Sequence, residues 1–133
     1  MNDKITIQVR DVMKKKFDMV DGMDTVENAL NAMEYLETKT LVVSKRHEND
    51  EFGMVTLSDI ARQVLAADRP PERVNIYEIM SKPVISVSPN MDIRYCARLF
   101  SRFNLSRAPV VERGEVIGLV SFTDMVAKGL RTK

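Results

Sequence analysis

Two segments of the chain place a glycine, two hydroxyl side chains and a carboxylate in the same order. They read GMVTLSDI, beginning at Gly53, and GLVSFTDM, beginning at Gly118. A carboxylate can accept hydrogen bonds from both hydroxyls of a ribose, and the N-terminus of a following helix favours an anionic group. The pattern predicts a small polar ledge for a sugar-containing ligand, written twice. Its candidate side chains are Thr56, Ser58 and Asp59, and Ser121, Thr123 and Asp124.

Helix capping offers a second interpretation of the same residues. Serine, threonine and aspartate are favoured at helix N-termini, where their oxygens accept from free backbone N–H groups. Capping accounts for Ser58 and Thr123, directly before the aspartates, but leaves Thr56 and Ser121 unexplained inside an apolar strand. A glycine at the start of each strand removes a side chain where something must come close. The residues alone leave ledge and cap both open.

The elements that would position these side chains also occur twice. Apolar residues at steps of three and four predict amphipathic helices over 26–36 and 93–103, and a second helix in each copy is expected to begin at Asp59 or Asp124. Charged loops between apolar runs predict pairs of strands. We expect strands at 40–44, 52–57, 108–112 and 116–122, with short extended pieces near 19–20 and 84–87.

The whole chain therefore reads as a tandem repeat. Asp59 and Asp124 lie 65 residues apart, and the apolar-Met pairs that end at Met13 and Met80 lie 67 apart. Two prolines after Asp68-Arg69 cannot continue a helix and end the first copy. We expect a first repeat at 9–67, a linker at 68–75 and a second repeat at 76–130. A unit of this size buries little core alone, so we expect one intertwined α/β body.

Composition narrows the function. The 133 residues carry 20 basic and 19 acidic side chains, which argues against nucleic acid as a partner, and no apolar run is long enough to span a membrane. Lys14-Lys15-Lys16 is expected to be a solvated loop. The single cysteine, Cys96, predicts a buried structural thiol and a cytoplasmic location. His47 is the only histidine and lies in a charged loop, so neither a metal site nor an evident general base is expected, and catalysis is not predicted.

At the level of these segments the sequence resembles a tandem pair of CBS domains, the modules named for cystathionine β-synthase. DVMKKKFDMVDGMDTVENAL, TLVVS and GMVTLSDI carry the resemblance in the first copy, and EIMSKPVISVSPNMDI, LSRAPVV and GEVIGLVSFTDM carry it in the second. The resemblance implies a small stand-alone α/β protein of two β-α-β-β-α repeats, packed sheet to sheet with pseudo-two-fold symmetry. It also implies two clefts between the sheets and association into homodimers.

The resemblance further implies an adenosine-containing ligand, such as AMP, ADP, ATP or S-adenosylmethionine, and no covalent cofactor. In the family pattern the aspartate holds the ribose and the hydroxyl residue approaches the phosphate, which singles out Asp59 with Thr56 and Asp124 with Ser121. The adenine-facing positions carry over from the segment before the first helix and from the strand that enters the Pro-Val-Val run. In the second copy they are Val84, Ile85, Val87, Arg107, Ala108 and Pro109, and in the first copy they are Met19, Val20, Lys39, Thr40 and Leu41.

The second copy matches the family better. Arg107 could present a forked cation to a phosphate, and the first copy is aligned with Lys39 at that position. Asp18 and Asp21 would add negative charge near the first site, which would either disfavour a polyphosphate or call for a metal. We therefore expect the stronger site at Asp124, in a sensor that signals through a separate effector protein. The alternative is a structural or protein-interaction scaffold that binds no nucleotide.

Overall fold

A computed structural model describes residues 6–131 and divides them into two compact units. The repeat-1 unit spans Lys16–Val84, and the repeat-2 unit joins residues 6–15 to 85–131. Each unit therefore combines the body of one repeat with the segment that opens the other repeat. Both are mixed α/β, as the sequence predicts.

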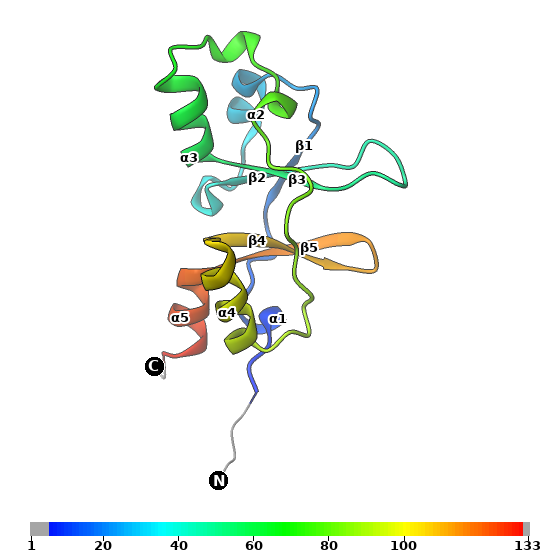
Figure 1. Cartoon of the computed structure of the whole chain (residues 1–133), viewed down its shortest axis with the longest axis vertical. Coiled ribbons are helices and arrows are strands. Elements are labelled where there is room, and N and C mark those ends of the chain that lie inside the picture. Colours follow the sequence, from blue (N-terminus) through cyan, green and yellow to red (C-terminus); the bar gives the residue numbers. More distant parts are fainter. Residues whose placement is uncertain (1–5, 132–133) are drawn as a thin grey trace. The chain divides into compact units, whose positions relative to one another are not determined.

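The repeat-1 unit is built on a three-stranded sheet. Strand β1 (Asp18–Val20) pairs in parallel with β2 (Thr40–Val43), which pairs antiparallel with β3 (Gly53–Thr56). Helices α2 (Val26–Ala32) and α3 (Leu57–Ile60) lie on one face of this sheet (Figure 1). Short helical turns complete the unit: η1 (Leu36–Thr38), η2 (Ala61–Leu65), η3 (Pro71–Arg73) and η4 (Ile76–Glu78).

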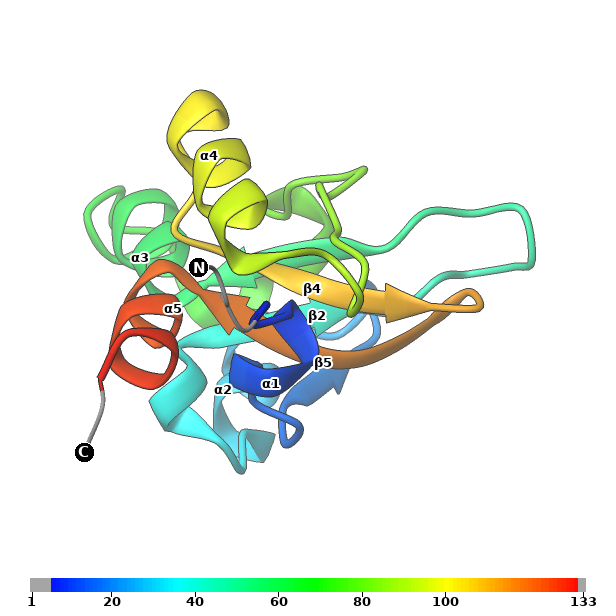
Figure 2. The same ribbon diagram turned by 90° about the horizontal axis from the view of Figure 1, so that it is seen from below.

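The repeat-2 unit follows the same plan with one strand reduced. Strands β4 (Arg107–Glu112) and β5 (Glu115–Ser121) form an antiparallel hairpin, and Val87 makes only an isolated parallel bridge to Val110 where β1 would be. The extended piece expected over 84–87 is thus limited to one bridged residue. Helices α1 (Val9–Val12), α4 (Ile93–Phe103) and α5 (Phe122–Gly129) lie on one side of the hairpin (Figure 1), and α1 contacts α5 (Figure 2).

The amphipathic patterns place the first helix of each repeat, although one is shorter than expected. Helix α4 runs over the full predicted span and buries Ile93, Cys96 and Phe100. Helix α2 ends at Ala32, so the prediction of a helix to residue 36 was wrong. The Asp18 carboxylate accepts hydrogen bonds from the backbone N–H groups of Glu34 and Tyr35, both at 2.9 Å, which favours ending the helix there.

Each unit has its own hydrophobic core. In the repeat-1 unit buried side chains come from α2, β2, β3, α3, η2 and η4, and Leu41, Val55 and Ile76 are fully buried among them. In the repeat-2 unit they come from α1, α4, β4, β5 and α5, with Val9 and Phe100 fully buried. The segment that opens each repeat thus completes the core of the unit built around the other.

Backbone hydrogen bonds fix this exchange of segments in the same way twice. Lys14 N–H donates to Leu119 O at 2.8 Å and Leu119 N–H donates back to Lys14 O at 2.9 Å. Ser81 and Met54 exchange the equivalent pair at 2.9 and 3.0 Å. A Cβ built on Gly118 would lie 2.7 Å from Lys14 O. The close neighbour that the strand glycine admits is therefore the exchanged segment of the chain itself.

Candidate functional site

The helices that follow the ledge strands begin earlier than the sequence predicts. Helix α3 starts at Leu57 and α5 at Phe122, so Thr56 and Ser121 are the N-cap residues. Their hydroxyls accept from the backbone N–H groups of Asp59 at 3.0 Å and Asp124 at 3.1 Å. The expectation that capping leaves Thr56 and Ser121 unexplained was wrong, because these two residues are the caps and Ser58 and Thr123 lie inside the helices.

The remaining hydroxyls of the motif are exposed. Ser58 lies inside α3, and Thr123 Oγ1 lies 3.1 Å from Ser121 Oγ within the first turn of α5. In the repeat-2 unit two hydroxyls therefore stand together at the start of a helix. Such a pair can donate to an anionic oxygen there.

Replacing Thr56 with alanine should destabilise the protein by about 1–2 kcal/mol, because it removes the N-cap and its half of a capping box with Asp59. The midpoint of urea unfolding, at unchanged slope, measures this loss. Ser58→Ala is the matched control and should change stability by less than about 0.5 kcal/mol. A larger loss for Ser58→Ala would contradict the assignment of the cap.

Asp59 is held within its own helix turn. Its Oδ2 accepts from the Thr56 backbone N–H at 2.9 Å, and its Oδ1 accepts from Arg62 Nη2 at 2.8 Å. The Arg62 side chain is 67% exposed, so this contact is a surface ion pair. Displacing Arg62 from the carboxylate would therefore cost little.

Asp124 has a different partner. Its Oδ2 accepts from Lys14 Nζ at 2.6 Å, and its side chain is only 12% exposed. Lys14 belongs to the exchanged segment of the repeat-2 unit, so the expectation of a solvated loop was wrong for this lysine. Lys15 and Lys16 are exposed. The sequence analysis did not single out Lys14 as a partner of Asp124, although its counterpart at the repeat offset of 67 is Ser81, which carries no charge.

The strand register shifts the alignment of the two copies by one residue. Thr40 pairs with Thr56, and Arg107 pairs with Ser121. Thr40 is therefore the counterpart of Arg107, and the alignment of Lys39 with Arg107 was wrong. Directly opposite residues in an antiparallel pair share a face with Cβ atoms about 5 Å apart. Arg107 thus stands beside the capping hydroxyl, where the repeat-1 unit has a buried threonine.

The acidic residues expected to repel phosphate from the first site have local roles. Asp18 is buried and accepts two backbone hydrogen bonds after α2. Asp21 accepts from the Met23 backbone N–H at 2.9 Å in an exposed turn. The carboxylate of Asp18 therefore has a structural role, since both of its oxygens accept hydrogen bonds from the backbone.

The other predicted contact residues are brought together only in part. Ala108, Pro109 and Val87 are buried, and Ile85 is exposed, all in the repeat-2 unit, whereas Val84 belongs to the repeat-1 unit. In the repeat-1 unit Met19 and Lys39 are exposed, and Leu41 and Thr40 are buried; Val20 is intermediate. The adenine-facing sets are therefore mixtures of core and surface positions.

Three further findings concern the cysteine, possible metal ligands and possible membrane spans. Burial raises the pKa of the Cys96 thiol to about 11, which confirms a buried structural cysteine. Among residues 6–131, no group of three or more histidine, cysteine, aspartate or glutamate side chains could hold a metal ion. Over the same range, no helix has the length and apolar character needed to cross a bilayer.

Comparison with known proteins agrees with the repeat and the fold. The family model described as CBS domain matches residues 9–66 and 76–130. The CBS domain-containing protein YhcV of Bacillus subtilis is 26% identical, over 88% of this chain and 81% of that protein. Three other curated relatives are longer, and the chain spans 62% of their length.

Solved structures give the same result. The hexameric CBS-CP12 protein from bloom-forming cyanobacteria is 34% identical and superposes with a TM-score of 0.87, over 92% of this chain and 70% of that one. A CBS domain pair in complex with 5′-methylthioadenosine and S-adenosyl-L-methionine is 23% identical, with a TM-score of 0.76 over 96% of this chain and all of that one. With two matched repeats that each carry the glycine, hydroxyl and aspartate segment, this chain belongs to the CBS domain family as a tandem CBS pair, a regulatory module.

Proposed function

We propose that this CBS pair is a sensor that binds an adenosine-containing ligand at the ledge of the repeat-2 unit and signals through a separate protein. The observation that carries the proposal is the cluster at the start of α5. Asp124 lies there with Lys14 at 2.6 Å, beside the hydroxyls of Ser121 and Thr123 and the strand position of Arg107. A carboxylate for a ribose and two cations for a phosphate are combined within one unit.

Charge supports this unit over the other. Lys14 and Arg107 bring two cations to the start of α5, beside the single carboxylate of Asp124, which suits an anionic nucleotide. In the repeat-1 unit the counterpart of Lys14 is Ser81 and that of Arg107 is Thr40. Among the described residues, Asp59 is ion-paired with Arg62, whose side chain is exposed. The S-adenosyl-L-methionine complex of the structurally similar pair supports the adenosine class of ligand.

The ligand must compete with the existing ion pair. Lys14 has three N–H donors, so it can keep one bond to Asp124 while another turns to a phosphate oxygen. Ligand binding at this aspartate would then act on the exchanged segment, because Lys14 N–H and C=O are bonded to Leu119. This gives the ligand a differential effect on the segment, as a regulatory response requires.

Thermal unfolding with AMP, ADP, ATP and S-adenosylmethionine tests the proposal. A ligand at 100 times its dissociation constant adds about 2.7 kcal/mol of stability, a shift of several degrees in Tm. Asp124→Asn should weaken the active compound by at least about ten-fold, since charged hydrogen bonds are lost, and Asp59→Asn should weaken it less. Equal or reversed losses contradict the assigned ledge. No shift with any of the four compounds favours a scaffold that binds no nucleotide.

We also propose that the pair functions as a homodimer and has no catalytic role of its own. Phe122 and Val126 on α5, and Leu130 at its C-terminal cap, are 36%, 57% and 68% exposed and follow each other at steps of four. Such a stripe on one helix face suits association with another apolar face. The hexameric state of the CBS-CP12 relative supports assembly, although of a different order.

A further inference from the structure

A cavity of about 380 Å³ opens within the repeat-1 unit, away from the ledge. It lies at the end of β2 where Val43 pairs with Gly53, whereas Thr56 is paired with Thr40 at the other end of the strand. Those ends are separated by about 10 Å at the rise of a β-strand. The cavity and the ledge are therefore different places on one sheet.

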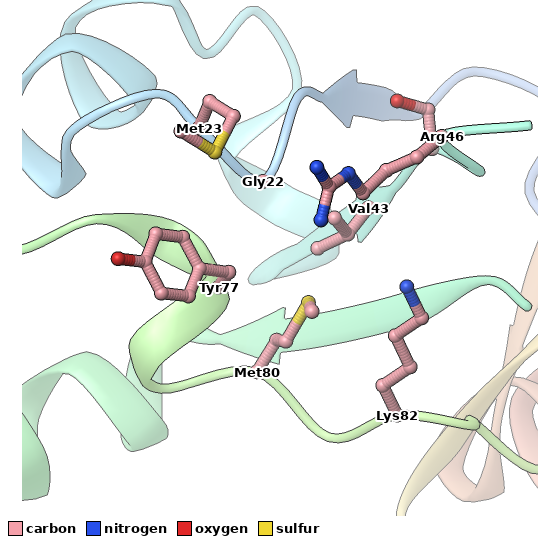
Figure 3. Close-up of a pocket in the computed structure, with 8 residues that line it drawn as sticks. Gly22, Met23, Val43, Arg46, Tyr77, Met80 and Lys82 are labelled. Atoms are coloured by element: carbon pink, nitrogen blue, oxygen red, sulfur yellow. The ribbon is translucent and has the colours of Figure 1, made fainter.

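The walls of this cavity divide into an apolar side and a cationic side. Tyr77 and Met23 lie on one side, and the guanidinium of Arg46 and the ammonium of Lys82 lie on the other (Figure 3). Val43 and Met80 also line it. Tyr77 is 49% exposed and Met23 is 59% exposed, so apolar surface remains open to water there.

Asp50 holds the Lys82 ammonium and the backbone of Arg46 on the cationic side. Its carboxylate oxygens lie 2.8 Å from Lys82 Nζ and accept from the Arg46 backbone N–H at 2.8 Å. These contacts hold the pKa of Asp50 well below its usual range, so the carboxylate stays ionised. The guanidinium of Arg46 makes no hydrogen bond or ion pair with another described residue. One net positive charge remains, which matches a ligand with one anionic group.

The other repeat provides an internal comparison. Tyr77 N–H donates to Gly22 O at 2.9 Å, and in the repeat-2 unit Arg10 N–H donates to Pro89 O at 3.0 Å. Arg10 therefore stands where Tyr77 does, and Asn90 stands where Met23 does. Arg10 Nη2 bonds Asn90 Oδ1 at 2.6 Å across that place. In the repeat-1 unit Tyr77 and Met23 make no such bond and instead line the cavity.

We infer that this cavity is a second small-molecule site, which takes a flat aromatic compound with one anionic group. The ring packs on Tyr77 and Met23, where stacking and sulfur contacts are available. The anionic group faces Arg46, with Lys82 beside it. The volume falls in the range of small-ligand pockets, roughly 300–1,000 Å³. Neither aspartate of the ledge motif takes part.

NMR titration of the ¹⁵N-labelled chain with indole-3-carboxylate tests the site, and the uncharged indole-3-carboxamide is the matched probe. Shifts should appear at Gly22, Met23 and Tyr77, and the carboxylate should bind about ten-fold tighter than the amide. Arg46→Gln should abolish that difference, whereas Arg113→Gln, in the exposed hairpin turn of the repeat-2 unit, should preserve it.

The double variant Met23→Asn, Tyr77→Arg installs the pair found in the other repeat and should remove binding of both probes while the fold is retained. Asp59→Asn and Asp124→Asn should leave both affinities unchanged, which separates this site from the proposed nucleotide ledge. Equal affinity for carboxylate and amide, shifts confined to the Asp59 end of the sheet, or no binding at millimolar probe would overturn the inference.

Discussion

Gly118→Val is expected to destabilise the protein by about 3 kcal/mol. A Cβ at this position would lie 2.7 Å from Lys14 O and 2.7 Å from Met13 Sδ. Methionine can move, but Lys14 O is backbone and accepts the Leu119 N–H at 2.9 Å. The variant must therefore either break the exchanged bridge or shift the strand.

Thermal and urea unfolding of Gly118→Val measure this loss, which should lower Tm by ten degrees or so. Gly22→Ala is the matched control, since its nearest new contacts lie at 3.5 Å, an ordinary van der Waals distance. Gly53→Ala should fall between them, because its shortest contact, at 2.9 Å, is to the flexible Met80 Sδ. A Gly118 variant as stable as Gly22→Ala would show that the exchanged segment does not need this glycine.

The sequence predicts the repeat and most strands because both depend on local patterns. The spacing of Ile93, Cys96 and Phe100 predicts a helix, and α4 spans the whole predicted range. The end of α2 is different, since it depends on the carboxylate of Asp18, 16 residues before Glu34. No local pattern reveals such a contact.

Two features of the ledge could not be predicted for similar reasons. The helix is capped by Thr56 rather than Ser58 because strand β3 stops pairing with β2 at Thr56, whose partner is Thr40. The role of Lys14 depends on which unit the first segment joins. Alignment of the two copies shows a difference in charge, because Lys14 corresponds to the neutral Ser81 while both copies keep the aspartate. The alignment does not show that Lys14 contacts Asp124.

Arg107→Gln is expected to weaken the binding of AMP by about 10–100-fold and to leave the affinity for adenosine almost unchanged. The reason is position: Arg107 is paired with Ser121 in β4 and β5, so its side chain lies on the face of the hydroxyl that caps α5. In the proposed complex the guanidinium meets the phosphate, and Asp124 meets the ribose. Only the phosphorylated ligand should therefore sense the loss of the cation.

Isothermal titration of the wild type, Arg107→Gln and Thr40→Gln with AMP and adenosine separates these roles. Thr40 is the counterpart of Arg107 in the repeat-1 unit and is fully buried, so unfolding curves must first show that Thr40→Gln is folded; Arg62→Gln replaces it if it is not. The first-repeat change should leave both affinities intact. Equal losses of AMP and adenosine in Arg107→Gln would mean that the arginine shapes the strand rather than binding phosphate. A loss confined to the first-repeat variant would place the nucleotide at Asp59, which is ion-paired with the exposed Arg62.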